Sequence, residues 1–126
     1  MRQSRIFAVD FDGTLAMHEY PGIGPEVPGA IDVLRGLQSN GHKIILYTMR
    51  SGEALRQAVD WVTERGIHLY GANENPDQGS WTSSPKVYAH HYIDDAAVGC
   101  PLVYGEHNRP YVDWDKVRSL VLDEIS

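Results

Sequence analysis

Two aspartates stand two residues apart at the end of an apolar segment. Asp10 and Asp12 follow residues 6–9, Ile-Phe-Ala-Val, a run that predicts a short strand buried on both faces. Carboxylates this close repel each other unless a cation lies between them or one holds a proton, and Gly13 allows a sharp turn after them. Because open α/β sheets bind ligands at the carboxyl edge of their strands, the pair suits a metal-assisted phosphoryl site.

Further polar residues follow the later apolar segments. Thr48 comes after the apolar run 43–47, Lys86 stands in a polar loop, and Asp94 and Asp95 directly follow 91–93. Parallel strands bring their carboxyl ends to one edge of a sheet, so groups far apart in sequence meet there. We therefore expect these side chains to share one site.

In order and spacing, these residues resemble the four motifs of the haloacid dehalogenase (HAD) superfamily of phosphohydrolases. The resemblance covers residues 5–95, as Asp10-Phe11-Asp12-Gly13-Thr14, Leu46-Tyr47-Thr48, Lys86 and Tyr92-Ile93-Asp94-Asp95. It implies a HAD-like α/β fold, a three-layer Rossmann-like parallel sheet flanked by helices. It also implies Mg²⁺-dependent hydrolysis of a phosphate monoester through an aspartyl-phosphate.

The resemblance assigns the acids to catalysis and to the metal. Asp10 is expected to be the nucleophile and to bind Mg²⁺ through its other oxygen. Asp12 is expected to protonate the leaving oxygen, then to accept a proton from water, while its backbone carbonyl touches the metal. Asp94 and Asp95 are adjacent, and either could complete the metal shell. Mg²⁺ fits this set because it prefers oxygen ligands and takes few protein carboxylates.

The resemblance also assigns residues to the phosphorylated substrate. Thr48 and the backbone amide of Met49 are expected to hydrogen-bond phosphoryl oxygens, and Lys86 to balance the charge of nucleophile and phosphate. Arg50 could fork onto a phosphate or a second acidic group of the substrate. A surface ion pair of Arg50 with Glu53 or Glu74 is the alternative.

Structural explanations compete with these roles. Asp10 and Asp12 could cap a strand-to-turn junction, and Lys86 could be a solvated loop lysine. Thr48 could cap the following helix, which is compatible with phosphate binding because a helix N-terminus is itself an anion site. Among the histidines, which lack any zinc-binding spacing, His18 is the one near the predicted site.

The competing functions are a phosphatase of nucleic-acid ends and a non-catalytic module that binds phosphate or metal. The net charge of −6 opposes extensive nucleic-acid binding. The second acid, Asp12, argues against a mere binding module, which has no need of it.

Apolar periodicity and turn residues predict the elements that position these groups. In chain order we expect a strand at 6–9, a flap at 16–27, a helix opened by Pro28 and stopped at 40–41, a strand at 43–47, a helix at 51–65, a strand at 67–70, a loop at 71–84, a helical turn at 85–89, and strands at 91–93 and 102–104. A last helix is expected after Asp113, its cap. The alternation of strands and helices implies parallel β-α-β units.

Many members of the HAD superfamily carry a cap, an inserted module that closes over the site. The two intervals that could hold it here, 15–48 and 48–86, have no room for one. We therefore expect an open site, which either admits a bulky substrate or is covered by the 71–84 loop or by a partner subunit in a homo-oligomer.

Length and composition indicate one domain spanning residues 1–126. No apolar run approaches the length of a membrane span, and no secretory signal precedes the first strand. Cys100 is the single cysteine, so an internal disulfide is excluded and a reducing cytoplasm is expected.

Overall fold

The centre of the fold is a four-stranded parallel sheet. The computed structural model describes residues 3–105 and 109–125. The strands are β1 (Ile6–Val9), β2 (Lys43–Leu46), β3 (Leu69–Ala72) and β4 (His91–Ile93), in the order β3-β2-β1-β4. Every pairing within this sheet is parallel, so all four strands end at the same edge, as predicted.

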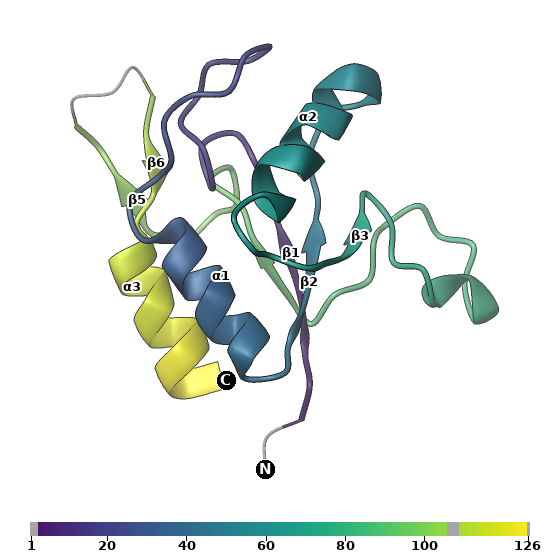
Figure 1. Cartoon of the computed structure of the whole chain (residues 1–126). Helices are drawn as coiled ribbons and strands as arrows, with labels where there is room; N and C mark the ends of the chain where they lie inside the picture. Colours follow the sequence, from purple (N-terminus) through teal and green to yellow (C-terminus); the bar gives the residue numbers. More distant parts are fainter. Residues whose placement is uncertain (1–2, 106–108, 126) are drawn as a thin grey trace.

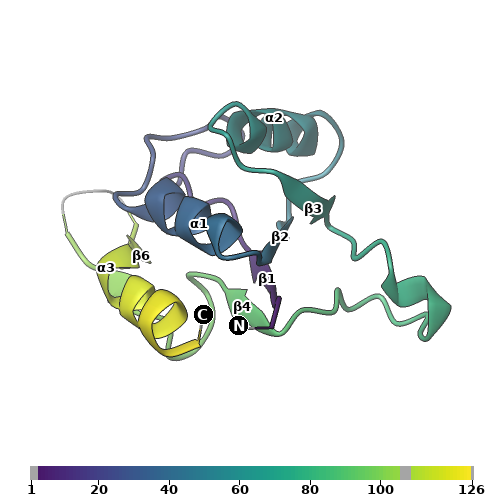
Figure 2. The same ribbon diagram turned by 60° about the horizontal axis from the view of Figure 1, so that its bottom comes forward.

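The helices pack on one face of this sheet. They are α1 (Ala30–Ser39), α2 (Gly52–Thr63) and α3 (Trp114–Arg118), the last continued by a π-helical turn, η2 (Ser119–Ile125). Figures 1 and 2 show all three on the same side of the strands. Phe7 and Val9 of β1 and Ile44 and Leu46 of β2 alternate toward them and belong to the main core cluster. The expected α/β fold with a Rossmann-like parallel sheet and flanking helices is confirmed. All three α-helices lie on one face, so the expected three-layer arrangement lacks its second helical layer in the described part of the chain.

The opposite face is covered by the segment between β3 and β4. Ala8, Ile45 and Tyr92 are register partners on that face. The Tyr92 hydroxyl donates to the carbonyl of Val87 at 2.6 Å and accepts from the Ala89 amide at 3.2 Å. Residues 87–89 of this segment therefore contact β4, whereas the part around η1 (Gln78–Ser80) extends away from the sheet (Figures 1 and 2).

The helical turn predicted at 85–89 is wrong. Val87 and Ala89 are buried, whereas Lys86 and Tyr88 are exposed, an alternation of period two. Such alternation indicates extended backbone, in which residues i and i+2 share a face. In a helical turn the residues that share a face are three or four positions apart. The preceding loop contains a short 3₁₀ turn, η1 (Gln78–Ser80), and is ordered by the Gln78 side chain, which bonds the backbone of residues 84, 86 and 88.

The flap at 16–27 is a short hairpin, as expected. The Met17 amide donates to the Pro25 carbonyl and the Val27 amide to the Leu15 carbonyl, both at 2.8 Å. Within the described part of the chain, neither this interval nor the one after β2 holds an inserted domain above the strand ends.

The C-terminal segment forms a second, separate sheet. Strand β5 (Leu102–Val103) is present, but it pairs antiparallel with β6 (Tyr111–Val112) in a separate hairpin and does not extend the main sheet. The Val112 amide donates to the Gly13 carbonyl at 2.9 Å, and the Trp114 indole N–H donates to the Thr14 carbonyl at 2.7 Å. These two bonds fasten the hairpin and α3 to the turn that follows Asp10.

Element boundaries differ from the sequence prediction by a few residues. Helix α1 begins at Ala30, after Gly29 in the left-handed region, and β3 begins two residues later than expected. Asp113 caps α3 as predicted, its carboxylate accepting from the Lys116 amide at 3.2 Å. Among the described residues, no helix has both the length and the apolar character needed to cross a membrane.

Candidate active site

A pocket of about 530 Å³ opens at the carboxyl edge of the sheet. Its lining includes five of the predicted site residues with acidic or hydroxyl side chains: Asp10, Asp12, Thr48, Asp94 and Asp95. In Figure 1 the strands β1 and β2 point toward the end of the molecule where the flap, the β5–β6 hairpin and the start of α2 stand. The sequence therefore identified the residues at the base of the pocket.

Three carboxylates in this pocket lie close enough to share a cation. One oxygen each of Asp10, Asp94 and Asp95 lies within 4.8 Å of the others. Burial, a hydrogen bond with the Asp95 carboxyl and the nearby charge of Asp94 raise the pKa of Asp10 from 3.8 to about 8. Burial and the charge of Asp95 also raise the pKa of Asp94. A hard-oxygen cluster whose negative charges repel one another fits Mg²⁺, which would relieve that repulsion.

The turn after Asp10 joins the acids to one another. The buried Thr14 hydroxyl donates to Asp10 Oδ2 at 3.1 Å and accepts from the Asp95 amide at 3.2 Å. Gly13 has a φ of 84°, and a Cβ there would collide with the side chains of His18 and Asp95. Only glycine allows the chain to turn this close to the acid cluster.

His18 joins the flap to the acid cluster. Its Nε2 lies 3.0 Å from Asp95 Oδ2, and both side chains are mostly buried. The only signal in the sequence was the place of His18 in the flap, because this contact links residues 77 positions apart.

Arg50 is held by Asp12 and the flap. Its Nε and an Nη each donate to a different oxygen of Asp12 at 2.8 Å, forming a bidentate pair. The guanidinium also donates to the carbonyls of Pro21 and Gly22 in the flap, and Arg50 is only 2% exposed. The expected surface pair with Glu53 or Glu74 is therefore wrong, because the acidic partner of Arg50 is Asp12. Arg50 lines the pocket, and its contact with a substrate phosphate stays a prediction.

Thr48 lies on a loop that Asn73 supports. The Thr48 amide donates to Asn73 Oδ1 at 2.8 Å, and Asn73 Nδ2 donates to the Arg50 carbonyl at 3.1 Å. Thr48 Oγ accepts from the Arg50 amide at 3.1 Å, and Ser51 is the N-cap of α2. Thr48 is therefore not the helix cap, and its hydroxyl lines the pocket together with Met49.

Lys86 lies apart from this pocket. It lines a different depression of about 320 Å³ with Trp81, Tyr88 and Tyr92, and its Nζ stands 5.3 Å from the centre of the Tyr92 ring. Lys86 is on the exposed side of the extended segment, because Val87 and Ala89 occupy the buried side. In this conformation the expected contact of Lys86 with nucleophile and phosphate is not formed.

We predict that Mg²⁺ raises the melting temperature more at about pH 8 than at about pH 6, because below the raised pKa of Asp10 the cation must displace a proton. The sign follows from linkage. A carboxyl whose folded pKa exceeds its unfolded value destabilises the metal-free fold increasingly as pH rises from 3.8 to about 8. Mg²⁺ removes that penalty. Thermal unfolding with MgCl₂ or EDTA at both pH values measures the rise in melting temperature that Mg²⁺ causes. An equal rise at both pH values would contradict the assignment of Asp10.

Comparison with known proteins adds one relative. No family model matches the chain, and no curated protein matches it. Among solved structures, a conserved protein encoded by a locus of Bacteroides thetaiotaomicron superposes with a TM-score of 0.80 at 34% sequence identity, covering 98% of this chain and 94% of that one. The chain therefore belongs to the same family as this conserved protein of Bacteroides thetaiotaomicron.

Proposed function

We propose that the protein is a Mg²⁺-dependent phosphatase of the HAD superfamily that hydrolyses a phosphate monoester through an aspartyl-phosphate on Asp10. The observation that carries this proposal is the cluster of Asp10, Asp94 and Asp95, whose oxygens lie within 4.8 Å of one another at the carboxyl edge of a parallel sheet. Asp12 and Thr48 line the same pocket. This is the set of groups that phosphoryl transfer needs: a nucleophile, a cation site, an acid and a phosphate ligand.

The proposed reaction has two displacements at phosphorus. An Asp10 oxygen forms a bond to phosphorus while the bond to the substrate oxygen breaks, and Asp12 gives its proton to that oxygen. Water then attacks phosphorus, Asp12 takes its proton, and the bond to Asp10 breaks. Asp10, Asp94 and Asp95 would hold Mg²⁺, which would neutralise part of the phosphoryl charge. Thr48 Oγ and the Met49 amide hold phosphoryl oxygens during both displacements.

The Arg50 contact adds a condition to the role of Asp12. Both Asp12 oxygens accept hydrogen bonds from Arg50, so a proton that Asp12 carries toward the substrate would occupy a lone pair that Arg50 leaves free. Arg50 also bonds the flap, so the orientation of the Asp12 carboxyl depends on the position of the flap in this proposal.

The alternative functions have less support. A phosphatase of nucleic-acid ends is compatible with the uncapped pocket, but the net charge of −6 gives no attraction for a polyanion. A non-catalytic module does not need Asp12 beside the acid cluster. We further propose a cytoplasmic location, for which the single cysteine is the supporting observation.

The first test is hydrolysis of a simple aryl phosphate by the intact chain. We expect turnover with MgCl₂, loss of turnover with excess EDTA, and full recovery when Mg²⁺ is restored, because the acid cluster depends on a hard cation. A panel of phosphorylated metabolites would then rank substrates. Turnover that survives exhaustive chelation would contradict the metal assignment. Absence of turnover on every phosphate ester in the panel would favour the non-catalytic module.

A further inference from the structure

We propose that the substrate carries a second anionic group beside its phosphate and that Arg109, on the β5–β6 hairpin, binds this group. The inference rests on the proposed phosphatase function and deepens it by naming the substrate class. Arg109 lines the same pocket as Asp10, Asp12 and Thr48, although it lies outside the segment that carries the phosphatase motifs. Its side chain would contact the part of the substrate that leaves.

The hairpin is fixed to the catalytic turn. The Val112 amide of β6 donates to the Gly13 carbonyl at 2.9 Å. Val112 comes three residues after Arg109, and Gly13 comes three residues after Asp10. The Asp113 amide donates to the Pro101 carbonyl at 2.9 Å, which closes the base of the hairpin. These bonds hold β6, which begins two residues after Arg109, beside the turn that follows Asp10.

The other nearby cations are already engaged or lie elsewhere. Arg50 is 2% exposed and donates to both oxygens of Asp12 and to the flap, so its guanidinium has little capacity for substrate. Lys86 lines a separate depression. Arg109 is exposed, and no ion pair joins it to an acidic side chain within the described part of the chain. A guanidinium in this state is suited to bidentate binding of a carboxylate or phosphate.

Two apolar side chains line the pocket with Arg109. Met49 is 97% exposed and Tyr20, in the flap, is 64% exposed, although both are large hydrophobic residues. Exposed apolar groups in a concave site are typical of ligand contacts. The centre of the Tyr20 ring also lies 5.1 Å from the Arg50 guanidinium carbon, a cation–π contact that helps to hold this flap residue in place. Met49 and Tyr20 are the residues that would contact an apolar part of such a substrate.

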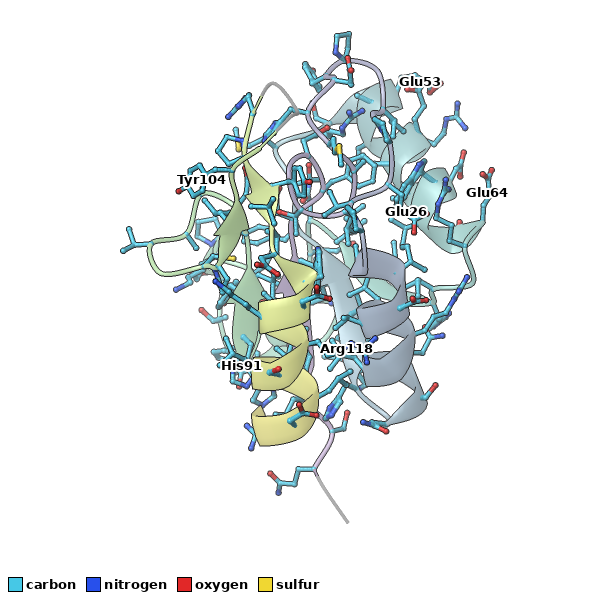
Figure 3. The ribbon with its side chains drawn as sticks, turned by 90° about the vertical axis from the view of Figure 1, so that its left-hand side faces the viewer. Glu26, Glu53, Glu64, His91, Tyr104 and Arg118 are labelled. Carbon is cyan, nitrogen blue, oxygen red and sulfur yellow. The ribbon has the colours of Figure 1, made fainter. Side chains whose placement is uncertain are left out.

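The experiment compares three aryl phosphates on the intact chain with Mg²⁺: phenyl phosphate, 4-carboxyphenyl phosphate and its neutral isostere 4-carbamoylphenyl phosphate. The variants are Arg109→Gln and the matched control Arg118→Gln. Arg118 is an exposed residue of α3 that does not line the pocket (Figure 3), so the control makes the same change in net charge away from the site. The measured quantity is the ratio of kcat/KM for the carboxylated ester to that for its carbamoyl isostere. Because each variant is compared with the wild type, differences in leaving-group reactivity cancel.

We expect Arg109→Gln to lower this ratio about tenfold, the size of one charge-assisted hydrogen-bonding contact, and to lower kcat/KM for phenyl phosphate less than kcat/KM for the carboxylated ester. Arg118→Gln should leave the ratio unchanged. An unchanged ratio in Arg109→Gln, with phenyl phosphate still hydrolysed, would overturn the role of Arg109 and leave the phosphatase proposal standing. Hydrolysis of none of the three esters by the wild type would overturn the phosphatase proposal itself. An equal fall for all three esters would overturn the specificity role, because it would indicate a general structural effect.

Discussion

Asp10→Asn is expected to lower kcat for aryl phosphate hydrolysis by roughly 10⁴-fold or more, the scale seen when a nucleophile is removed from an enzyme. The amide cannot form the acyl phosphate, and it is also a poorer ligand for the cation. The side chains are nearly the same size, so packing at the end of β1 should change little. The measurement is single-turnover and steady-state hydrolysis with MgCl₂.

The same variant has a second, opposite signature in stability. Asp10 is largely buried beside Asp94 and Asp95, which raises its pKa to about 8. A neutral amide removes that repulsion, so metal-free Asp10→Asn should melt higher than the wild type near pH 8, and Mg²⁺ should stabilise it less. Asp115→Asn, at an exposed position in the first turn of α3, is the matched control: it should not raise the melting temperature and should leave the stabilisation by Mg²⁺ unchanged. If Asp10→Asn keeps near wild-type turnover, Asp10 is not the nucleophile.

The second large effect is expected from Asp12→Asn, which should slow turnover by about 10²- to 10⁴-fold, the range for loss of a general acid and base. Loss of phosphate from the enzyme should suffer most, because the attacking water needs a base, whereas an activated leaving group needs no acid. The asparagine can retain only one acceptor oxygen toward Arg50, in place of the two that the carboxylate provides.

Rapid quench with an activated aryl phosphate tests this role. For Asp12→Asn we expect a burst of phenolate near one equivalent per active site, followed by slow turnover. Unactivated esters should show a larger loss and no burst, because their leaving oxygen needs the proton. Equal proportional losses on both kinds of ester, without a burst, would show that Asp12 is not the acid and base.

Local patterns in the sequence determined the main elements and the base of the pocket. Apolar runs predicted β1, β2 and β4, and the 3.6-residue periodicity predicted α2 because its buried face has to meet the sheet. Parallel strands end at one edge, so the acids that follow β1 and β4 had to converge there. That inference needs no side-chain detail, and the pocket contains Asp10, Asp12, Asp94 and Asp95.

The tertiary structure decided where the cations lie. The partner of Arg50 is Asp12, 38 positions away, and no local pattern distinguishes that contact from an ion pair with Glu53. Lys86 follows a loop whose path depends on side-chain bonds from Gln78, and burial of Val87 and Ala89 then directs it away from the acids.

The C-terminal hairpin was also decided by long-range contacts. A two-residue strand such as β5 carries too little pattern to show which strand it pairs with, and its pairing with β6 separates it from the main sheet. The bonds from Val112 and Trp114 to the turn after Asp10 then bring Arg109 to the pocket. The sequence alone therefore determined which carboxylates meet, because strand direction suffices for that. Folding decided that Arg109 lines the pocket, because that depends on hydrogen bonds between segments about a hundred residues apart.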